Sequence, residues 1–387
     1  MLITFLFWVS AANAQGWSPA SDPKNFGQNY NPTFSELPLE ATLPESLLPW
    51  SGPFWKDRQG SISYDWQQEK GSWSLPLPSE AEVKALSAEQ IEALPPSVKF
   101  DIARNRYDYP IFKATEKYAG KPRFSQRLNP LWHAWYGICD GLAQASLHYK
   151  NPYPASITNA LGKEIRFGSG DLKALAAYYY AYVAVVETPS TEFPVRRDDR
   201  VRKRIGENCF PNSPKFPTKP READSDETGT EPEATCGRDL NPGALHIALT
   251  NRIGFEKQGF IADFSPGETI NQHPVYGFST TVLAERPPGL GSAAFTVREI
   301  RVKTTLKFAF YDRAHWDRTP TVEKTRSLGY WLELDQSGNI IGGSYDPHGS
   351  GKVPDYIWTS EPLVFGHGFE ILNHLMRMRQ TPSRPSP

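Results

Sequence analysis

The C-terminal half of the chain constrains the fold most, because four segments after Pro242 alternate apolar and polar residues between Gly and Asn turns. They read ALHIALTNRIGFEKQGFIADFS, HPVYGFSTTVLAE, FTVREIRVKTTLKFAFYD and LGYWLELDQSGNIIGGSYD. Such alternation predicts an antiparallel sheet. The 387 residues include 35 prolines, and because proline interrupts helices this number argues against a bundle of long helices. We therefore expect a mixed α+β fold.

Helices are predicted before and after this sheet. One starts at about Ser79 in PSEAEVKALSAEQIEAL, and another runs from about Cys139 to His148. A third covers FGSGDLKALAAYYYAYVAVVE, with Ser169 or Asp171 as its cap. Because this third helix is apolar on nearly all sides, we expect it to be buried. A short helix is predicted in HGFEILNHLMRM near the C-terminus.

The first residues are typical of a secretory signal peptide. Leu2 to Val9 form an apolar core, and Ala12-Asn13-Ala14 follows as an A-x-A cleavage site, so residues 1–14 are expected to be removed. The alternative is a buried N-terminal strand. No later run approaches the roughly 18 apolar residues of a membrane span. The net charge of −1 provides no general attraction to nucleic acid. We expect a secreted or periplasmic protein without a membrane span.

The mature chain is predicted to have two parts. Residues 15–125 are expected to form an N-terminal extension that wraps the core, because their first part, 15–75, is rich in proline, tryptophan and polar residues. Residues 126–387 are expected to form the catalytic domain. Within it, residues 188–240 carry a basic cluster followed by proline-rich and acidic stretches with almost no apolar content, which indicates a mobile insertion.

Two of the three cysteines bracket this insertion. In an oxidising compartment Cys209 and Cys236 are the natural disulfide pair, and two free thiols are the alternative. Closing a loop of about 27 residues stabilises a fold by on the order of 3–4 kcal/mol in the chain-entropy model. This pairing leaves Cys139 free, and a single unpaired cysteine in an exported protein is a candidate reactive thiol.

Cys139 lies where the predicted helix begins, after a glycine that allows a tight turn, in WYGICDGLAQASLHY. The N-terminus of a helix is partially positive, so it lowers the pKa of a thiol placed there. The backbone N–H of the first turn is also free to stabilise an oxyanion. The alternative is a buried cysteine that only fills the core.

A second candidate pair lies in HIALTNRIGFEKQGFIAD. If Gly254-Phe255 forms a two-residue hairpin turn, His246 and Asp263 face each other on neighbouring strands. A histidine held by a carboxylate is the base that a cysteine nucleophile requires. The alternatives are a core histidine and an aspartate that caps a turn. Together with Cys139, the pattern favours a Cys-His-Asp triad.

Other catalytic classes lack their motifs. No H-E-x-x-H sequence and no zinc-spaced set of Cys and His is present, which disfavours a metalloenzyme. The G-x-S-x-G motif of serine hydrolases and the papain-type cysteine signature are also missing. We expect no cofactor. Calcium dependence stays open, although the acidic run at Glu222–Glu233 is too irregular to match a calcium loop.

Several blocks, in order along the chain, resemble the transglutaminase elicitor family of plant-pathogenic oomycetes and bacteria. They are LLPWSGPFWKDRQGSISYDWQ, WYGICDGLAQA, IRFGSGDLKALAAYYY, NPGALHIALTN with GFIADFSPGE, HPVYGF, and YWLELDQSGNIIGGSYD with PDYIW. The sequence departs from the family at three positions. Asp140 follows the cysteine, Leu142 stands where tryptophan is frequent, and Asn271 replaces a tryptophan.

The resemblance implies a papain-like, transglutaminase-type core with the nucleophile at a helix N-terminus, packed on the antiparallel sheet. By position, Cys139 would be the nucleophile, His246 the base and Asp263 its partner. Asp140 is the departure with the clearest chemical consequence, because a carboxylate beside the thiol opposes thiolate formation.

The implied reaction is that of a protein-glutamine gamma-glutamyltransferase. The Cys139 thiolate attacks a glutamine carboxamide, ammonia leaves, and a lysine amine resolves the thioester to an isopeptide bond. The partners are therefore proteins that supply glutamine and lysine side chains. Trp132 and Trp135 could wall the site and exclude water, or they could be ordinary core aromatics. Two alternatives stay open: a thiol protease or glutamine deamidase with the same triad, and a non-catalytic surface or cell-wall binding protein.

Overall fold

The structure is a computed structural model of the chain. The structure describes residues 16–69, 75–119, 136–184, 203–206, 239–265, 270–346 and 353–378. The predicted signal peptide, Trp132, Trp135, Cys209 and Cys236 lie outside these residues.

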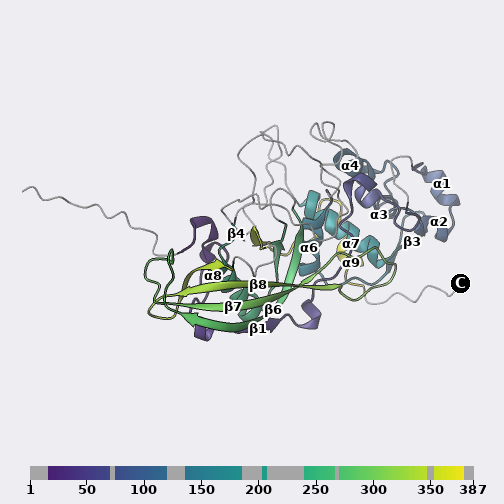
Figure 1. The fold of residues 1–387 in the computed structure, drawn as a ribbon. Coiled ribbons are helices and arrows are strands. Elements are labelled where there is room, and N and C mark those ends of the chain that lie inside the picture. The colour runs from purple at the N-terminus through teal and green to yellow at the C-terminus, as the bar shows by residue number, and fades with distance from the viewer. Residues whose placement is uncertain are drawn as a thin grey trace, which may run out of the picture.

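The described residues form helices and strands in alternating groups (Figure 1). The helices are α1 (Glu80–Ala85), α2 (Ala88–Glu92), α3 (Pro96–Ala103), α4 (Pro110–Ala119), α6 (Cys139–His148), α7 (Ser169–Tyr178), α8 (Pro242–Leu249) and α9 (Glu370–Leu375). Two π-helical turns, η8 (Tyr179–Val183) and η10 (Thr250–Phe255), extend α7 and α8. The strands are β1 (Glu40–Thr42), β2 (Ala155–Thr158), β3 (Glu164–Phe167), β4 (Lys203–Gly206), β5 (Phe260–Asp263), β6 (Gln272–Arg286), β7 (Arg298–Ala309), β8 (Glu323–Leu334), β9 (Ile340–Tyr345) and β10 (Tyr356–Thr359). Short 3-10 turns occupy the N-terminal segment: Pro19–Ser21, Pro23–Asn25, Phe34–Glu36, Glu45–Leu47, Asp57–Gln59 and Ser61–Ser63.

Eight strands form one large antiparallel, curled sheet in the order β4-β10-β5-β6-β7-β8-β9, with β1 paired to β6. The predictions of an α+β fold and of an antiparallel sheet in the C-terminal half are therefore confirmed. The register pairs Asp263 of β5 with Gln272 of β6 and with Tyr356 of β10. These three residues come from three neighbouring strands and lie at the same level of the sheet.

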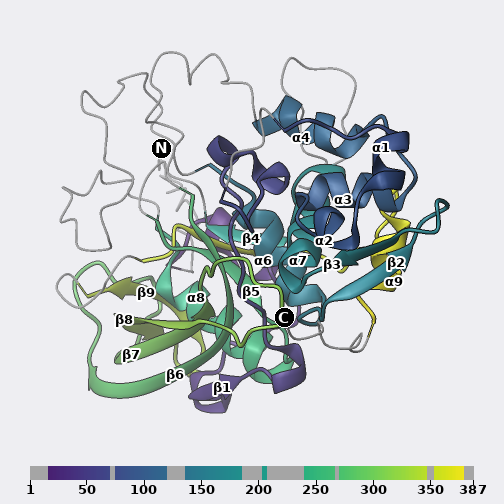
Figure 2. The same ribbon diagram turned by 90° about the vertical axis from the view of Figure 1, so that its right-hand side faces the viewer.

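The molecule has a helical side and a sheet side, which lie next to each other in both views (Figures 1 and 2). Helices α3, α4, α7 and α9 gather around one apolar core, which includes Phe100, Phe167 and Phe369. The sheet and α8 enclose a second core, which includes Leu245, Phe278 and Tyr330. Burial of apolar area in both cores is the main stabilising contribution to the fold.

Two predicted elements differ in the structure. The helix expected from Ser79 is two helices, because Ser87 forms a second capping box with Gln90 and starts α2. The hairpin expected around Gly254-Phe255 is wrong, since residues 242–255 form α8 and η10. The Asn241 side chain accepts hydrogen bonds from the N–H groups of Gly243 and Ala244, and Pro242 occupies the first helical position, which together start a helix.

Three other expectations agree with the structure. The helix predicted from Cys139 to His148 is α6 with those bounds. The apolar helix α7 is buried along its whole length, and the Asp171 carboxylate accepts the N–H of Gly168 at its start. The short C-terminal helix is α9. Within the range predicted as an insertion, residues 203–206 form β4 on β10, while the acidic stretch lies outside the described residues.

Candidate functional site

The start of α6 is held against the N-terminal segment by backbone contacts. The N–H of Ile138 donates to the carbonyl of Phe54 (2.8 Å), and the N–H of Asp57 donates to the carbonyl of Tyr136 (2.8 Å). A Cβ atom on Gly137 would lie 2.4 Å from the Phe54 carbonyl oxygen, so only glycine allows this approach. The segment PFWKD therefore fixes the backbone immediately before Cys139.

Helix α6 lies between the two cores. Gly141 packs so closely on α7 that a Cβ atom there would lie 2.0 Å from the Ala177 carbonyl oxygen. Leu142 belongs to the core of the helical side, whereas Ala143 packs with Ile261 and Trp358 of the sheet. The helix is consequently fixed on both faces, and Cys139 at its first residue faces the ends of β5 and β6.

The Cys139 thiol is half-buried and hydrogen-bonded from two directions. The backbone N–H of Gln272 and the hydroxyl of Tyr311 donate to the sulfur, and both contacts lower its pKa. Burial has the larger and opposite effect, and the Asp140 carboxylate adds to it, so that the pKa of the thiol rises from 9.0 to about 12. The expectation of a helix-activated thiolate is therefore wrong for this state of the site, in which the sulfur is protonated at neutral pH.

Asp263 is the buried carboxylate on the sheet side of the thiol. Its Oδ1 accepts the N–H groups of Ser265 (3.1 Å) and Asn271 (2.9 Å), and the Tyr356 hydroxyl also donates to its carboxylate. These donors lower the pKa of Asp263, but burial is the largest effect and raises the pKa from 3.8 to about 6. The negative charge of Asp263 also raises the pKa of Cys139, so the two groups interact electrostatically.

Tyr311 connects the thiol to the strand that carries Gln272. Its hydroxyl lies 2.6 Å from Oδ1 of Asn271 and 3.2 Å from the Gln272 carbonyl oxygen, besides its contact with the thiol. One phenol proton serves only one of these acceptors at a time, so the hydroxyl can turn between the sulfur and Asn271. Tyr356 has a comparable place beside Asp263, and its hydroxyl accepts a hydrogen bond from Nε2 of Gln272 (2.8 Å).

The structure brings Cys139 and Asp263 together but places His246 elsewhere. His246 is fully buried in α8, its Nδ1 lies 2.8 Å from the Tyr330 hydroxyl, and its ring packs on Phe34. Burial lowers its pKa to about 4. Because residues 242–249 form a helix instead of a strand, His246 does not face Asp263 across a hairpin. The contacts of His246 are those of a core histidine, which was the alternative interpretation.

Sequence reasoning missed Gln272, Tyr311, Tyr356 and His273 as neighbours of the site. His273 follows Gln272 on β6 and packs on the Tyr311 ring, with 4.7 Å between ring centroids. A signal was present, since His273 begins the HPVYGF block directly after Gln272, and Tyr311 lies within the FAFYD stretch. No local pattern relates these positions to Cys139, because the contacts depend on the order of strands in the sheet.

The described residues contain no group of three or more His, Cys, Asp or Glu side chains placed to hold a metal ion. In the same part of the chain, no helix combines the length and the apolar character that crossing a bilayer requires. Cys139 is the free cysteine of the described residues.

Two comparisons with known proteins found a similarity. Residues 212–297 match the family model described as transglutaminase elicitor. The fold matches the crystal structure of the GP42 transglutaminase from Phytophthora sojae with a TM-score of 0.60, over 91% of this chain and 94% of that chain, at 18% sequence identity. No curated protein matches the chain in sequence. An identity this low establishes a shared fold, and the family model adds a match in sequence. Residues 212–297 are therefore similar in sequence to the transglutaminase elicitor family, and the chain shares the fold of the GP42 transglutaminase.

Proposed function

We propose that the protein is a transglutaminase, an acyltransferase that forms glutamine–lysine isopeptide bonds through a thioester on Cys139. The observation that carries this proposal is the thiol at the first residue of α6, which accepts the N–H of Gln272 on β6 and is close enough to the buried Asp263 carboxylate of β5 for that charge to raise its pKa. The fold shared with the GP42 transglutaminase supports the same reaction class. The substrates would be proteins that supply glutamine and lysine side chains.

The first step is acyl transfer to sulfur. Because the pKa of the thiol is about 12 and that of Asp263 about 6, the sulfur keeps its proton until it begins to bond to the glutamine carboxamide carbon. Asp263 then takes the thiol proton as general base and gives a proton to the departing ammonia. The Gln272 N–H and the Tyr311 hydroxyl, which donate to the sulfur, stabilise the negative charge that develops.

The second step decides the reaction class. A lysine amine attacks the thioester carbonyl, Asp263 accepts its proton, and the thiol leaves with a proton, which gives the isopeptide bond. If water attacks instead, the product is glutamate and the enzyme is a deamidase. Trp132 and Trp135 remain proposed walls that favour the amine by excluding water.

The proposal gives Asp263 the role of base that the sequence assigned to His246. Nδ1 of His246 is hydrogen-bonded to the Tyr330 hydroxyl, and Nε2 has no hydrogen-bond partner among the described residues. Neither ring nitrogen contacts the thiol or Asp263. A Cys–Asp pair, supported by two tyrosine hydroxyls, is the arrangement that the geometry favours.

The remaining expectations stay part of this proposal. The family supports export to an oxidising compartment, so we retain the signal peptide at 1–14 and the disulfide between Cys209 and Cys236. We also retain the division into a wrapping extension, 15–125, and a catalytic domain, 126–387, with an insertion at about 188–240.

The test is amine incorporation. A glutamine-bearing protein incubated with a fluorescent primary amine should become labelled, ammonia should be released in step with the label, and Cys139→Ala should abolish both while keeping the same circular dichroism spectrum. Ammonia release without label would identify a deamidase, and main-chain cleavage with neither would identify a protease. Labelling that persists in Cys139→Ala would disprove thiol catalysis.

A further inference from the structure

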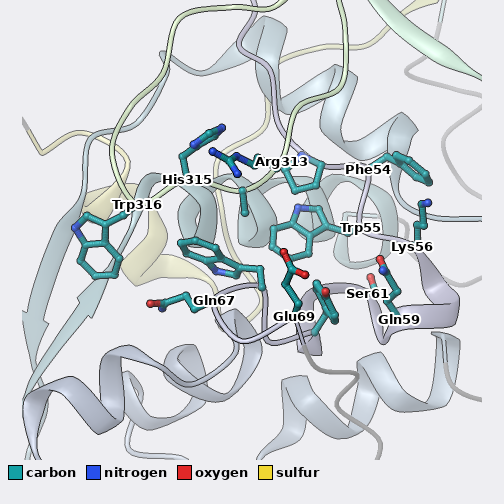
Figure 3. Close-up of a pocket in the computed structure, with 14 residues that line it drawn as sticks. Phe54, Trp55, Lys56, Gln59, Ser61, Gln67, Glu69, Arg313, His315 and Trp316 are labelled. Atoms are coloured by element: carbon teal, nitrogen blue, oxygen red, sulfur yellow. The ribbon is translucent and has the colours of Figure 1, made fainter.

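A pocket of about 550 Å³ lies beside the candidate site, between the N-terminal segment and the loop that follows β7 (Figure 3). The first wall comes from residues 53–69, which include Trp55, Lys56 and Ser61. The second wall is residues 313–316, with Arg313 at its start. The volume falls within the range of pockets that enclose a small ligand or several side chains of a peptide.

The pocket shares its walls with the Cys139 site. The carbonyl of Phe54, a lining residue, accepts the N–H of Ile138 directly before Cys139. The Phe54 ring packs on Tyr311 with 5.0 Å between centroids, and Tyr311 donates to the thiol. Arg313 follows Tyr311 by two residues in the same loop. A chain bound across the thiol would therefore place neighbouring residues in the pocket.

Two buried polar atoms on the lining side chains have no protein partner among the described residues. Nε1 of Trp55 and Oγ of Ser61 make no hydrogen bond there, although the side chains are 3% and 0% exposed. Both residues also have a positive φ, 50° for Trp55 and 49° for Ser61. An unpaired buried donor is costly, and strained backbone is frequent where a ligand binds. Both atoms can be paired by an acceptor oxygen of a ligand.

The charge of the lining selects the ligand. Lys56 and Arg313 are cationic and Glu69 is anionic, while His315 is paired with Asp312 at 3.1 Å. The excess positive charge disfavours a lysine ammonium, which is the acceptor substrate of a transglutaminase. It favours carbonyl and carboxylate oxygens, while Trp55 and the other aromatic rings of the lining favour a flat side chain. Figure 3 shows the Trp55 indole in the middle of these side chains.

We propose that this pocket binds the acyl-donor polypeptide, specifically an aromatic and an acidic residue that flank the reactive glutamine. The inference rests on the proposed function for the place of the glutamine at Cys139. Trp55 Nε1 would donate to an oxygen of the bound chain, and Arg313 and Lys56 would bind the acidic side chain. The lysine substrate would approach Cys139 from another side.

The test uses two labelled peptides that contain one glutamine and one phenylalanine and differ only in an adjacent aspartate or lysine. Binding is measured by fluorescence anisotropy with the Cys139→Ala protein, which cannot react. The aspartate peptide should bind about tenfold more tightly, and replacing its phenylalanine with alanine should weaken binding several-fold. Equal affinities, or tighter binding of the lysine peptide, would overturn the proposal.

Three variants give the test its controls. Arg313→Glu, at an exposed position, should remove or invert the preference for the aspartate peptide. The control is Lys303→Glu, on the exposed face of β7, which changes the net charge equally and should leave that preference intact. Trp55→Phe removes the unpaired donor together with part of a buried ring, so the Tm should fall, and affinity, measured well below that Tm, should fall several-fold. If binding is selective but wild-type protein transfers no amine, the proposed function fails and the pocket stands. If amine is transferred without flank preference, the pocket assignment fails alone.

Discussion

The region around His246 and the region around Cys139 both bury titratable groups, but they differ in the charge of the surrounding side chains. In the sheet core, His246 meets the Tyr330 hydroxyl, which lies 2.7 Å from the Thr304 hydroxyl, and that in turn contacts Thr280. All of these partners are neutral, as a stable core requires. Between α6 and the sheet, two carboxylates raise the pKa of the thiol instead. Unfavourable electrostatics of this kind mark a functional site more often than a structural one.

The largest expected effect is the loss of activity in Asp263→Asn. The amide of asparagine cannot take up the thiol proton, so kcat for amine incorporation should fall by about 10²–10⁴. In the wild type, the rate should rise as pH increases through about 6, where Asp263 loses its proton. Steady-state kinetics across pH 4–8 measures both. Retention of activity in Asp263→Asn would remove the carboxylate from the mechanism.

The same variant separates catalysis from stability. The folded pKa of Asp263, about 6, exceeds its ordinary value of 3.8, so the unfolded chain releases this proton first as pH rises and stability falls between about pH 4 and 6. Asp263→Asn removes that loss and should be as stable as wild type or more stable at pH 7, by at most about 3 kcal/mol. Urea unfolding at pH 7 measures the difference.

His246→Ala should show the opposite combination. Loss of the ring on Phe34 and of the bond to Tyr330 should reduce the free energy of unfolding by about 2–4 kcal/mol. The kcat of the folded fraction should stay within about twofold, which is measured at a temperature well below the Tm. A loss of activity as large as that of Asp263→Asn would instead identify His246 as a catalytic residue.

Acid unfolding provides a second measurement on His246→Ala. Burial depresses the folded pKa of His246 from 6.5 to about 4, so the unfolded chain takes up a proton first and wild-type stability falls as pH drops through this range. The variant should lose stability less steeply. Some acid sensitivity should remain, because burial also lowers the pKa of His273 to about 3.

The sequence predicted local features of the site and missed distant ones. The start of α6 at Cys139 follows from neighbouring residues, and most of the sheet follows from alternation. The strand expected in ALHIALTNRI is wrong because a short apolar run fits a buried helix equally well. The local signal that distinguishes the two is Asn241 followed by Pro242, which starts a helix. The Tyr311 contact with Cys139 joins residues far apart in the chain and depends on the strand order.

Asp140→Asn should have an intermediate effect, on the reactivity of the thiol. The Asp140 carboxylate is the largest cause of the raised Cys139 pKa after burial, so its removal should lower that pKa and increase the thiolate fraction at any given pH. The rate of alkylation by iodoacetamide at pH 8 should increase by up to about tenfold. Alkylation at an unchanged or lower rate would show that Asp140 does not act on the sulfur.

Tyr311→Phe should have the smallest effect and the opposite sign. The hydroxyl donates to the sulfur and lowers its pKa, so the variant should be alkylated about threefold more slowly, on the scale of one neutral hydrogen bond. The phenylalanine ring keeps the packing on Phe54 and His273, so the Tm should hardly change.

The double variant Tyr311→Phe with Asp140→Asn separates the influences of the hydroxyl and of the carboxylate on the thiol. If both act on the sulfur independently, their effects on the alkylation rate multiply. If Tyr311 instead stays turned toward Asn271, at 2.6 Å, the single variant is alkylated at the wild-type rate.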